Sequence, residues 1–370
     1  MPVQLQVFTK RRAFSSVLIC KIMRRKIKTL YIFGRRRSVI TFFIIFIVSM
    51  LSVCRWLAQI GSRALLLPSP PDQNLEHLRR NRSLKYYIDK TQLLIEPSST
   101  PCDGVEEVPI LVLVTSPPAR FEQRSVIRST WAKYQPTYFV MGLDGPTVDE
   151  QLVDNYVEAK QYGDLVIFDF QEHYHNLSLK TALMLQWTLD RCPQVEFLLK
   201  TDDDVFVNPW MLKQVVKDNK DAQLLGYRIN NTYLHRDEYN KWYLPRWLYP
   251  DDAVSAYLSG TAYFISGEYI SKILKAAFTV PLVNLEDIYF SYLVAKKYLH
   301  LTLFHDRRLS PQKPCFLIAC VYWHLATAHS VSPAELANVW PKIETIANEF
   351  RQHEDVCKYY EILSSDLFLY

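Results

Sequence analysis

The chain is organised around the stretch Phe197-Leu198-Leu199-Lys200-Thr201-Asp202-Asp203-Asp204-Val205-Phe206-Val207-Asn208. Its apolar beginning has the length of a buried strand, and three carboxylates and a second apolar run follow. Acids beside a core repel one another and lose hydration, and both effects favour protonation. A hard divalent cation removes that conflict, because Mg²⁺ and Mn²⁺ bind carboxylate oxygens and bridge to phosphate. A solvated turn or helix cap is the alternative for the triplet alone, but the flanking apolar runs favour a metal and phosphate site.

Short apolar segments alternate with helical patterns from residue 108 onward. The predicted strands are residues 110–114, 138–142, 165–168 and 197–200, and the predicted helices are residues 120–133, 148–162 and 180–191. Strands of this length separated by longer helices indicate an α/β fold with a mostly parallel central sheet. The acidic triplet then lies at the carboxyl edge of the sheet, where open α/β folds bind ligands.

The positive charge of the chain is concentrated at its beginning. Residues 1–37 contain 11 Lys and Arg and no acid, so a net charge of +5 for the whole chain leaves −6 for the rest. Residues 38–54 are uncharged and are bounded by arginines, which is the short end of what crosses a bilayer as a helix, with the basic side cytoplasmic. A cleaved signal peptide and a nucleic-acid-binding arm are the alternatives. We predict a basic cytoplasmic tail (1–37), a transmembrane signal-anchor (38–54) and no nucleic-acid partner.

The rest of the chain is predicted to lie in the lumen of the secretory pathway. Residues 55–104 are rich in Pro, Ser, Arg and Asn, which is typical of an extended stem, and residues 105–370 form the folded domain. Five of the seven cysteines lie beyond the span, so two bridges are the simplest arrangement in an oxidising compartment. Tripeptides of the N-glycosylation type begin at Asn81, Asn176 and Asn230.

Three basic residues are candidates for phosphate contacts. Arg124 and Arg128 are four residues apart, hence on one face of the first predicted helix. Guanidinium groups suit phosphate oxygens, although an exposed arginine pair without function is the alternative. Lys180 begins the third predicted helix and is a candidate for contact with phosphate or with an acid of the triplet.

The second half of the chain supplies a further acid pair. Gly260 stands in an apolar segment, where the absence of a side chain lets the backbone approach a ligand. Glu286 and Asp287 are adjacent, and a carboxylate can take the proton of an attacking hydroxyl. Acids that favour a helix N-terminus are the alternative.

Aromatic residues gather between residues 239 and 257. They are Tyr239, Trp242, Tyr243, Trp247, Tyr249 and Tyr257. Their rings suit the apolar faces of sugars or bases, and simple core packing is the alternative.

Taken together, these stretches resemble the β-1,3-glycosyltransferase family, which contains the β-1,3-galactosyltransferases and β-1,3-N-acetylglucosaminyltransferases. The matching stretches are Arg124–Trp131, Asn176–Thr181, Lys200–Asn208, Ser259-Gly260 with Tyr263, Glu286–Tyr289, and His329 with Pro333 and Trp340. Six matches in the right order cover about residues 108–341.

The resemblance implies a GT-A type nucleotide-sugar-binding fold, a UDP-sugar donor, Mn²⁺, inversion at the anomeric carbon and a Golgi type II membrane protein with a lumenal catalytic domain. By position it makes Asp287 the general base, and Asp204 and His329 the metal ligands. The same correspondence places two sets near the substrates. Donor or nucleotide contacts are Arg124, Arg128, Lys180, Asp202 and Asp203, and the acceptor or donor pocket includes Gly260, Tyr263 and Glu286.

The chain departs from the family pattern at four positions. Ala262 and Ser291 stand where the family often has glycine, which bears on substrate fit. Leu258 and Leu293 stand where many members carry cysteines, so both halves of a bridge are replaced together. The resemblance then leaves Cys102 with Cys192 and Cys320 with Cys357 as the predicted bridges.

We therefore expect an inverting hexosyltransferase that moves galactose or an N-acetylhexosamine from UDP to a glycan hydroxyl of a glycoprotein or glycolipid, in β-1,3 linkage. A homodimer is left open. One alternative is a membrane-anchored carbohydrate-binding protein without turnover, which the presence of Asp287 disfavours because a binding module needs no base. A metal-dependent phosphodiesterase fits the triplet alone and leaves the later motifs unexplained.

Overall fold

The computed structural model of the chain describes residues 46–55, 76–144, 148–350, 357 and 360. Residues 46–55 form a helix, and none of the helices within these ranges has both the length and the apolar character needed to cross a membrane. The predicted tail and the first part of the predicted anchor, residues 38–45, lie outside the described residues.

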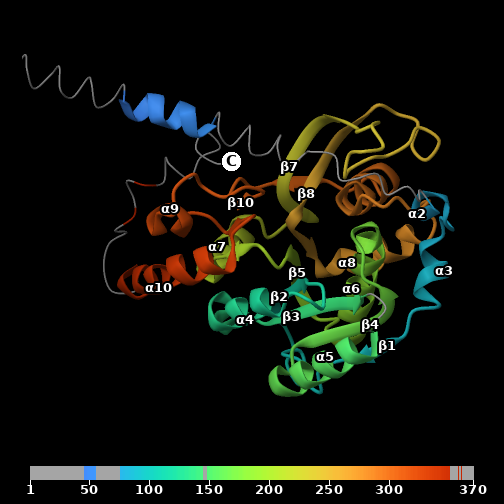
Figure 1. The fold of residues 1–370 in the computed structure, drawn as a ribbon, viewed down its shortest axis with the longest axis horizontal. Coiled ribbons are helices and arrows are strands. Elements are labelled where there is room, and N and C mark those ends of the chain that lie inside the picture. The colour runs from blue at the N-terminus through green and yellow to red at the C-terminus, as the bar shows by residue number, and fades with distance from the viewer. Residues whose placement is uncertain (1–45, 56–75, 145–147, 351–356, 358–359, 361–370) are drawn as a thin grey trace, which may run out of the picture. The chain divides into compact units, whose positions relative to one another are not determined.

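The folded domain is built on an eight-stranded sheet with the order β1-β4-β3-β2-β5-β8-β7-β9 (Figure 1). Its strands are β1 (Leu93–Ile95), β2 (Val108–Thr115), β3 (Thr137–Leu143), β4 (Leu165–Gln171), β5 (Val195–Asp202), β7 (Leu224–Tyr233), β8 (Ala253–Ser266) and β9 (Leu303–His305). The four strands β4, β3, β2 and β5 are parallel, and β8 joins β5 in the antiparallel sense. The expected α/β fold with a mostly parallel centre is thus present, with an antiparallel extension.

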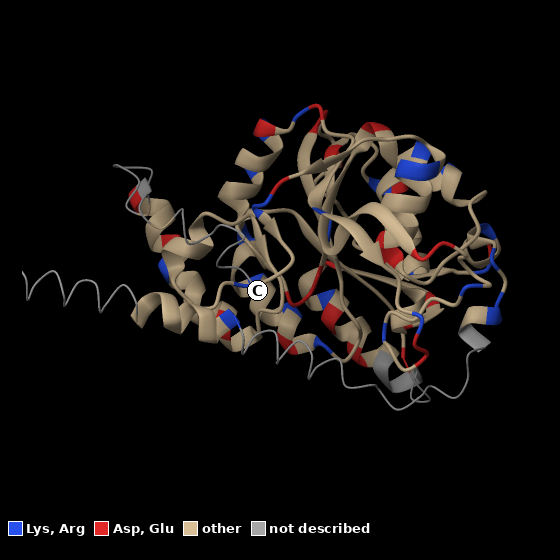
Figure 2. Cartoon of the chain, turned by 90° about the horizontal axis from the view of Figure 1, so that it is seen from above, with Lys and Arg blue, Asp and Glu red and all other residues tan. Residues whose placement is uncertain are grey.

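Helices cover both faces of this sheet. One face packs against α4 (Phe121–Ser129), α5 (Val148–Tyr162), α7 (Pro209–Asp218) and α10 (Pro333–Phe350). The other face packs against α3 (Leu84–Ile88), α6 (Leu177–Arg191), α8 (Gly267–Ala277) and a helix with π-type hydrogen bonding, η3 (Ile288–Tyr298). In the described part of the chain, basic and acidic side chains are interspersed over these elements (Figure 2).

A second, three-stranded sheet has the order β10-β11-β6. Its strands are β10 (Leu309–Ser310), β11 (Thr327–Ala328) and β6 (Phe206–Val207), and α9 (Ala319–Trp323) precedes β11. After β6, Asn208 caps α7 by accepting hydrogen bonds from the N–H groups of Trp210 and Met211, and Pro209 occupies the first turn. The apolar run after the acidic triplet is therefore a short strand that leads directly into a capped helix.

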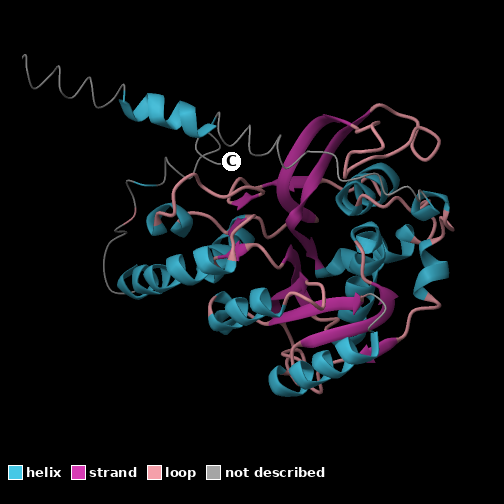
Figure 3. Cartoon of the chain, viewed as in Figure 1, coloured by secondary structure: helices cyan, strands magenta, loops and turns pink. Residues whose placement is uncertain are grey.

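The elements predicted between residues 108 and 202 are confirmed in order and type. The helix expected at 148–162 has the same bounds in the structure, and the helix expected at 120–133 ends earlier, at Ser129, and continues as a short 3₁₀ turn, Trp131–Tyr134. Beyond residue 209 the sequence pattern predicted little. There β7 and β8 pair as a long hairpin, and its connecting loop carries residues 234–252 (Figure 3).

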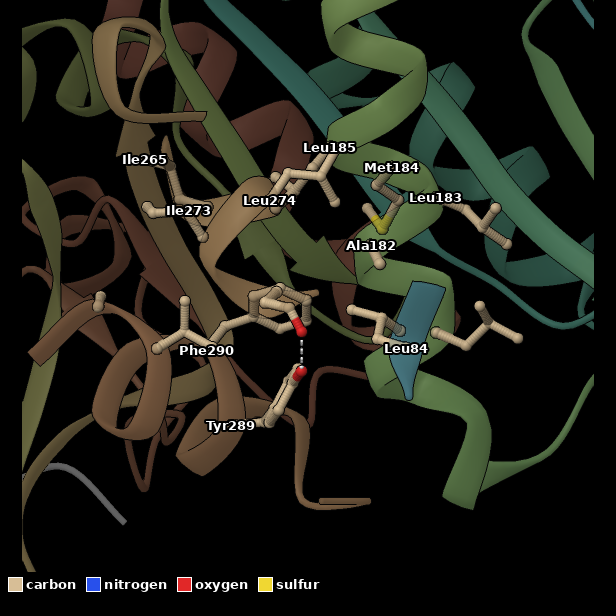
Figure 4. Close-up of a cluster of buried hydrophobic side chains, with 14 of the residues drawn as sticks. Leu84, Ala182, Leu183, Met184, Leu185, Ile265, Ile273, Leu274, Tyr289 and Phe290 are labelled. Carbon is tan, nitrogen blue, oxygen red and sulfur yellow. Dashed lines mark hydrogen bonds between the residues drawn. The ribbon is translucent and has the colours of Figure 1, made fainter. Parts of the chain in front are cut away.

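The stem predicted for residues 55–104 ends too late. Within it, α2 (Glu76–Arg79), α3 and β1 belong to the compact unit that also holds the sheet. Leu84 is fully buried, and Figure 4 shows it among side chains of α6 and η3. The polar composition that suggested a stem conceals a few apolar anchors, which is why the folded domain begins before residue 105.

Disulfide bonds join Cys102 to Cys192 and Cys320 to Cys357, as the resemblance predicts. Leu258 and Leu293, at which the resemblance implies cysteines in many members, are both buried in one apolar cluster.

Candidate active site

The acidic triplet lies at the carboxyl end of β5, as expected. Asp202 is the last residue of the strand and pairs with Thr115 at the end of the parallel strand β2. Its Oδ1 accepts hydrogen bonds of 2.7 Å from Thr115 Oγ1 and 2.7 Å from Lys200 Nζ. Burial opposes ionisation, but the Lys200 charge and these hydrogen bonds hold the pKa of Asp202 below its usual value. Asp202 is therefore a carboxylate at neutral pH.

Asp203 turns toward the segment that follows β2. Its two oxygens accept hydrogen bonds from Ser116 Oγ (2.8 Å) and from Arg120 Nη1 (2.7 Å). Burial raises the pKa of Asp203 to about 6, although Arg120 acts in the opposite direction. Arg120 is 45% exposed at this edge and carries a positive charge next to the triplet. Arg120 is not among the site residues predicted from the sequence, although its place between the first predicted strand and helix was an available signal.

Asp202, Asp204 and His329 form the group that could hold a metal ion. One ligand atom from each lies within 4.8 Å of the others. The small sheet brings His329 here, because β11 immediately precedes it and pairs with β6, which follows the triplet. The main-chain oxygen of Asp204 accepts a hydrogen bond of 2.9 Å from Val331 N, which holds the two segments together.

These three donors fit a divalent metal ion, because carboxylates suit Mg²⁺ and Mn²⁺ and an imidazole suits first-row transition metals. The structure brings together Asp204 and His329, the two ligands expected from the resemblance, with His329 Nε2 at 3.4 Å from Asp204 Oδ1. It adds Asp202, which the resemblance placed with the donor contacts.

The acid pair Glu286-Asp287 lies near the acidic triplet, because Lys200 reaches both groups. Glu286 and Asp287 precede η3, and Gly260 of β8 passes so close that a Cβ atom there would lie 3.2 Å from Cβ of Asp287. Any side chain at Gly260 would press on the acid pair, so the requirement for glycine is steric. Tyr263 donates a hydrogen bond of 2.6 Å to Glu286, which is also buried.

Burial raises the pKa of both acids. The pKa of Glu286 rises to about 7, with the Lys200 charge opposing the shift. The pKa of Asp287 is also raised, mainly by burial, while the N–H of Ile288 stabilises its ionised form. Asp287 is partly exposed and Glu286 is not, so Asp287 is the acid of this pair that a substrate can reach.

Lys200 connects the two acidic groups. Its buried Nζ donates hydrogen bonds of 2.7 Å to Asp202 and of 2.6 Å to the carbonyl oxygen of Gly260, and it lies 3.9 Å from Glu286. Lys200 is not among the site residues predicted from the sequence. Because Lys200 precedes Asp202 by two residues on one strand, both side chains share a face of the sheet, and that spacing was the available signal.

Ser291, one of the departures from the family pattern, also holds this region together. Its hydroxyl donates 2.6 Å to the carbonyl oxygen of Asp287 and accepts 2.9 Å from the N–H of Leu258. The side chain that replaces a glycine thus ties the beginning of η3 to β8.

Arg124 and Arg128, predicted near the nucleotide, point into an internal ion-pair network. All five N–H groups of Arg124 are used, by Glu158, Ser116 and the carbonyl oxygens of Pro117 and Pro118. Arg128 pairs with Glu158 and Asp164. Arg124 reaches the triplet only through Ser116, so its role is to position the segment that holds Asp203.

Lys180 is also fully enclosed, and its Nζ lies 2.6 Å from Glu172. Burial lowers the pKa of Lys180, while the charges of Glu172, Asp203 and Asp202 act to raise it. Its ion pair is thus with Glu172, and the acids of the triplet act on it through space.

The three sequons differ in exposure. Asn81 and Asn230 are exposed. Asn176 is half-buried, its amide nitrogen donates 2.8 Å to Gln171 O, its amide oxygen accepts from Arg80, and Ser178 is buried. A glycan on Asn176 would displace these contacts, so we do not retain Asn176 as a glycosylation site.

Comparison with known proteins agrees with this geometry. A family model described as galactosyltransferase matches residues 122–302. The chain is 31% identical over 261 residues to beta-1,3-galactosyltransferase 1 of Homo sapiens, covering 67% of this chain and 77% of that protein. It is 27% identical over 249 residues to the human beta-1,3-galactosyltransferase 5, covering 65% and 80%.

A solved glycosyltransferase involved in glycosylation of the PBCV-1 major capsid superposes with a TM-score of 0.32 at 14% identity, covering 64% of this chain and all of that one. The chain belongs to the galactosyltransferase family, which contains the β-1,3-galactosyltransferases.

Proposed function

We propose that the protein is an inverting hexosyltransferase that moves galactose or an N-acetylhexosamine from a UDP-sugar to a glycan hydroxyl in β-1,3 linkage. The observation that carries the proposal is the nearness of two acidic groups, the one at the end of β5 and the one directly before η3, which Lys200 joins. One group suits a diphosphate with its cation, and the other suits a hydroxyl that must lose a proton. A carbohydrate-binding protein without turnover has no use for the second group.

The donor side of the proposed site consists of Asp202, Asp204 and His329, which would hold Mn²⁺. When bound, that cation would neutralise charge on the diphosphate leaving group. Asp203, which accepts a hydrogen bond from Ser116, lies next to them in the chain. The exposed Arg120 provides a further positive charge for phosphate oxygens.

Asp287 is the general base of the proposed mechanism. An acceptor hydroxyl that attacks the anomeric carbon must release its proton, and a carboxylate with a raised pKa accepts a proton more readily than an exposed one. Glu286 is occupied by Tyr263 and faces Lys200. Its role is to hold the segment that carries Asp287.

We further propose a Golgi setting, with the membrane anchor at residues 38–54 and the catalytic domain in the lumen. The two disulfide bonds and the exposed sequons at Asn81 and Asn230 support an oxidising, glycosylating compartment. The acceptor would then be a glycoprotein or a glycolipid.

The test is UDP release by the purified full chain with a panel of UDP-sugars and simple β-glycosides, with Mn²⁺ and with chelator. We expect one donor to give acceptor-stimulated, Mn²⁺-dependent release. Asp287→Asn should lower the turnover rate by about 10²–10⁴-fold, because the positioned base is lost, while UDP and Mn²⁺ binding stay the same.

Asp221→Asn is the matched control, because Asp221 is exposed at the turn before β7. Normal transfer by Asp287→Asn would remove Asp287 from the role of base. Release of UDP that no acceptor stimulates would indicate hydrolysis of the donor and contradict the transferase.

A further inference from the structure

The loop between β4 and α6 lies between the acid pair and the β7–β8 loop. On one side, Ser178 donates a hydrogen bond of 2.7 Å to Val283 O, and His175 Nδ1 lies 3.2 Å from Asn284 Nδ2, two residues before Glu286. On the other side, Lys241 Nζ lies 4.7 Å from the ring centre of Tyr174. Residues 174–178 thus link Asp287 to the loop that carries the aromatic cluster.

Tyr174 itself faces the acids. Burial raises the pKa of Tyr174, and the carboxylate of Asp287 is the next contribution in the same direction. Burial and Asp287 together raise the pKa of Tyr257, on β8, to about 12. The charge of the proposed base therefore acts on both tyrosines.

Trp242, on the β7–β8 loop, is more exposed than Tyr174 and Tyr257. Its side chain is 37% exposed, its ring centre lies 5.5 Å from that of His235, and Lys241 Nζ lies 5.7 Å from its ring centre. An exposed tryptophan loses hydration at little cost when a partly apolar ligand covers it.

The backbone around Trp242 is held in place although it belongs to a loop. The Trp242 N–H donates 2.8 Å to Asn240 Oδ1, Leu244 N donates 3.0 Å to His235 O, and Asn240 contacts the His235 ring. A ring that is fixed before binding loses little entropy on binding. This arrangement is that of a binding surface rather than of a mobile loop tip.

We propose that Tyr174 and Trp242 form the binding site for a hexopyranose ring of the acceptor glycan. The apolar C–H face of the sugar would pack on the aromatic surface, and Lys241, whose Nζ lies over the Tyr174 and Trp242 rings, would donate to sugar hydroxyls. The acceptor hydroxyl then faces Asp287. The proposal rests on the proposed transferase function, and it assigns acceptor recognition to the joined loops 173–176 and 235–243.

The experiment measures binding and transfer separately. Ligand-observed NMR on the full chain, in the presence of UDP and Mn²⁺, tests methyl β-galactoside, methyl β-N-acetylglucosaminide and lactose. The variants are Trp242→Ala, Trp242→Phe and the control Trp247→Ala, since Trp247 is 59% exposed on the same loop.

We expect at least one glycoside to bind the wild type and Trp247→Ala. Trp242→Ala should weaken its binding and raise the acceptor KM by about tenfold, and Trp242→Phe should recover part of the loss. UDP binding and acceptor-free UDP release should not change, a result that a merely unfolded loop beside the donor site would not give.

Full glycoside binding by Trp242→Ala would overturn the proposal, as would equal losses in Trp242→Ala and Trp247→Ala. Binding of UDP without binding of any glycoside would also overturn it and leave the nucleotide site standing. Glycoside binding without transfer would support the sugar site and contradict the transferase.

Discussion

The buried ammonium group of Lys200 has two acidic groups as neighbours. It donates to Asp202 on the donor side and to the backbone of Gly260 beside Asp287. A buried charge is tolerated only when it is paired and hydrogen-bonded, so the position of Lys200 depends on both partners. We infer that Lys200 keeps the distance between the metal-binding acids and the general base constant.

Glu286 makes this arrangement sensitive to pH. Burial raises its pKa to about 7 from an ordinary value of 4.5, so the folded state binds a proton there more tightly than the unfolded chain. The stabilisation from that proton is fully present below the unfolded pKa, and is lost as the pH rises through the folded pKa. The free energy of unfolding should therefore fall between about pH 4.5 and pH 7 through this residue.

Glu286→Gln should remove that part of the pH dependence. The amide oxygen can still accept from Tyr263, and the uncharged side chain has no proton to lose. Urea unfolding at pH 5 and pH 8 should show a decrease in stability that is smaller in the variant by about 3 kcal/mol at most. Equal decreases in variant and wild type would mean that Glu286 titrates normally.

Residues with a distinctive chemical context were predictable, and residues defined by partners were not. Three acids between apolar runs and the Glu286-Asp287 pair drew attention by composition alone. Arg124 and Arg128 were assigned to the nucleotide because helical spacing shows a shared face and not what covers it. Their ion-pair partners, Glu158 and Asp164, lie some thirty residues further along the chain. A local sequence pattern does not predict such distant partners.

At the scale of elements, the segment from α2 to β1 is part of the folded domain. β1 pairs with β4 in the antiparallel sense, and Arg80 hydrogen-bonds to Asn176 and to the carbonyl oxygen of His175. Arg82 reaches Leu248 O in the β7–β8 loop, and its own carbonyl oxygen accepts from Leu282 N. The segment thus contacts each of the chain stretches that surround the proposed acceptor side.

A truncation series tests this role. A chain that begins at residue 76 keeps these contacts, whereas one that begins at residue 97 loses buried Leu78 and Leu84 together with β1. Loss of two buried leucines should cost at least about 4 kcal/mol, measured by urea unfolding. Equal stability of the two chains would mean that residues 76–96 do not stabilise the folded domain and belong to the stem.

Element prediction succeeded where the chain alternates strand and helix and failed where it does not. Buried parallel strands such as β2 are continuously apolar, and the helices between them have ordinary periodicity. β7 and β8 pair with each other beyond the ends of their other neighbours in the sheet, and they mix exposed and buried residues. η3 departs from the α-helical repeat, so its buried face has no 3.6-residue pattern. These are the elements that support the proposed acceptor side.

On the scale of the whole molecule, the candidate metal site joins distant parts of the chain. Asp202 ends a strand of the main sheet, Asp204 lies in the turn before β6, and His329 follows β11 of the small sheet. The chain segment between Asp204 and His329 contains most of the second half of the chain, including β7, β8 and η3. Occupation of the site by a cation would therefore connect the two sheets, and should stabilise the domain as a whole.

Mn²⁺ should accordingly raise the melting temperature of the folded domain. A ligand that binds only the native state at a hundred times its dissociation constant stabilises by about 2.7 kcal/mol, and for a domain of this size that corresponds to a shift of roughly 4–6 °C. Thermal unfolding with increasing Mn²⁺, and then with chelator, measures the shift. Asp204→Asn should abolish most of it because a charged ligand is lost, whereas Asp221→Asn should retain it. A shift of the same size in Asp204→Asn would place the cation elsewhere, and UDP should enlarge the shift only in chains that bind the metal at this site.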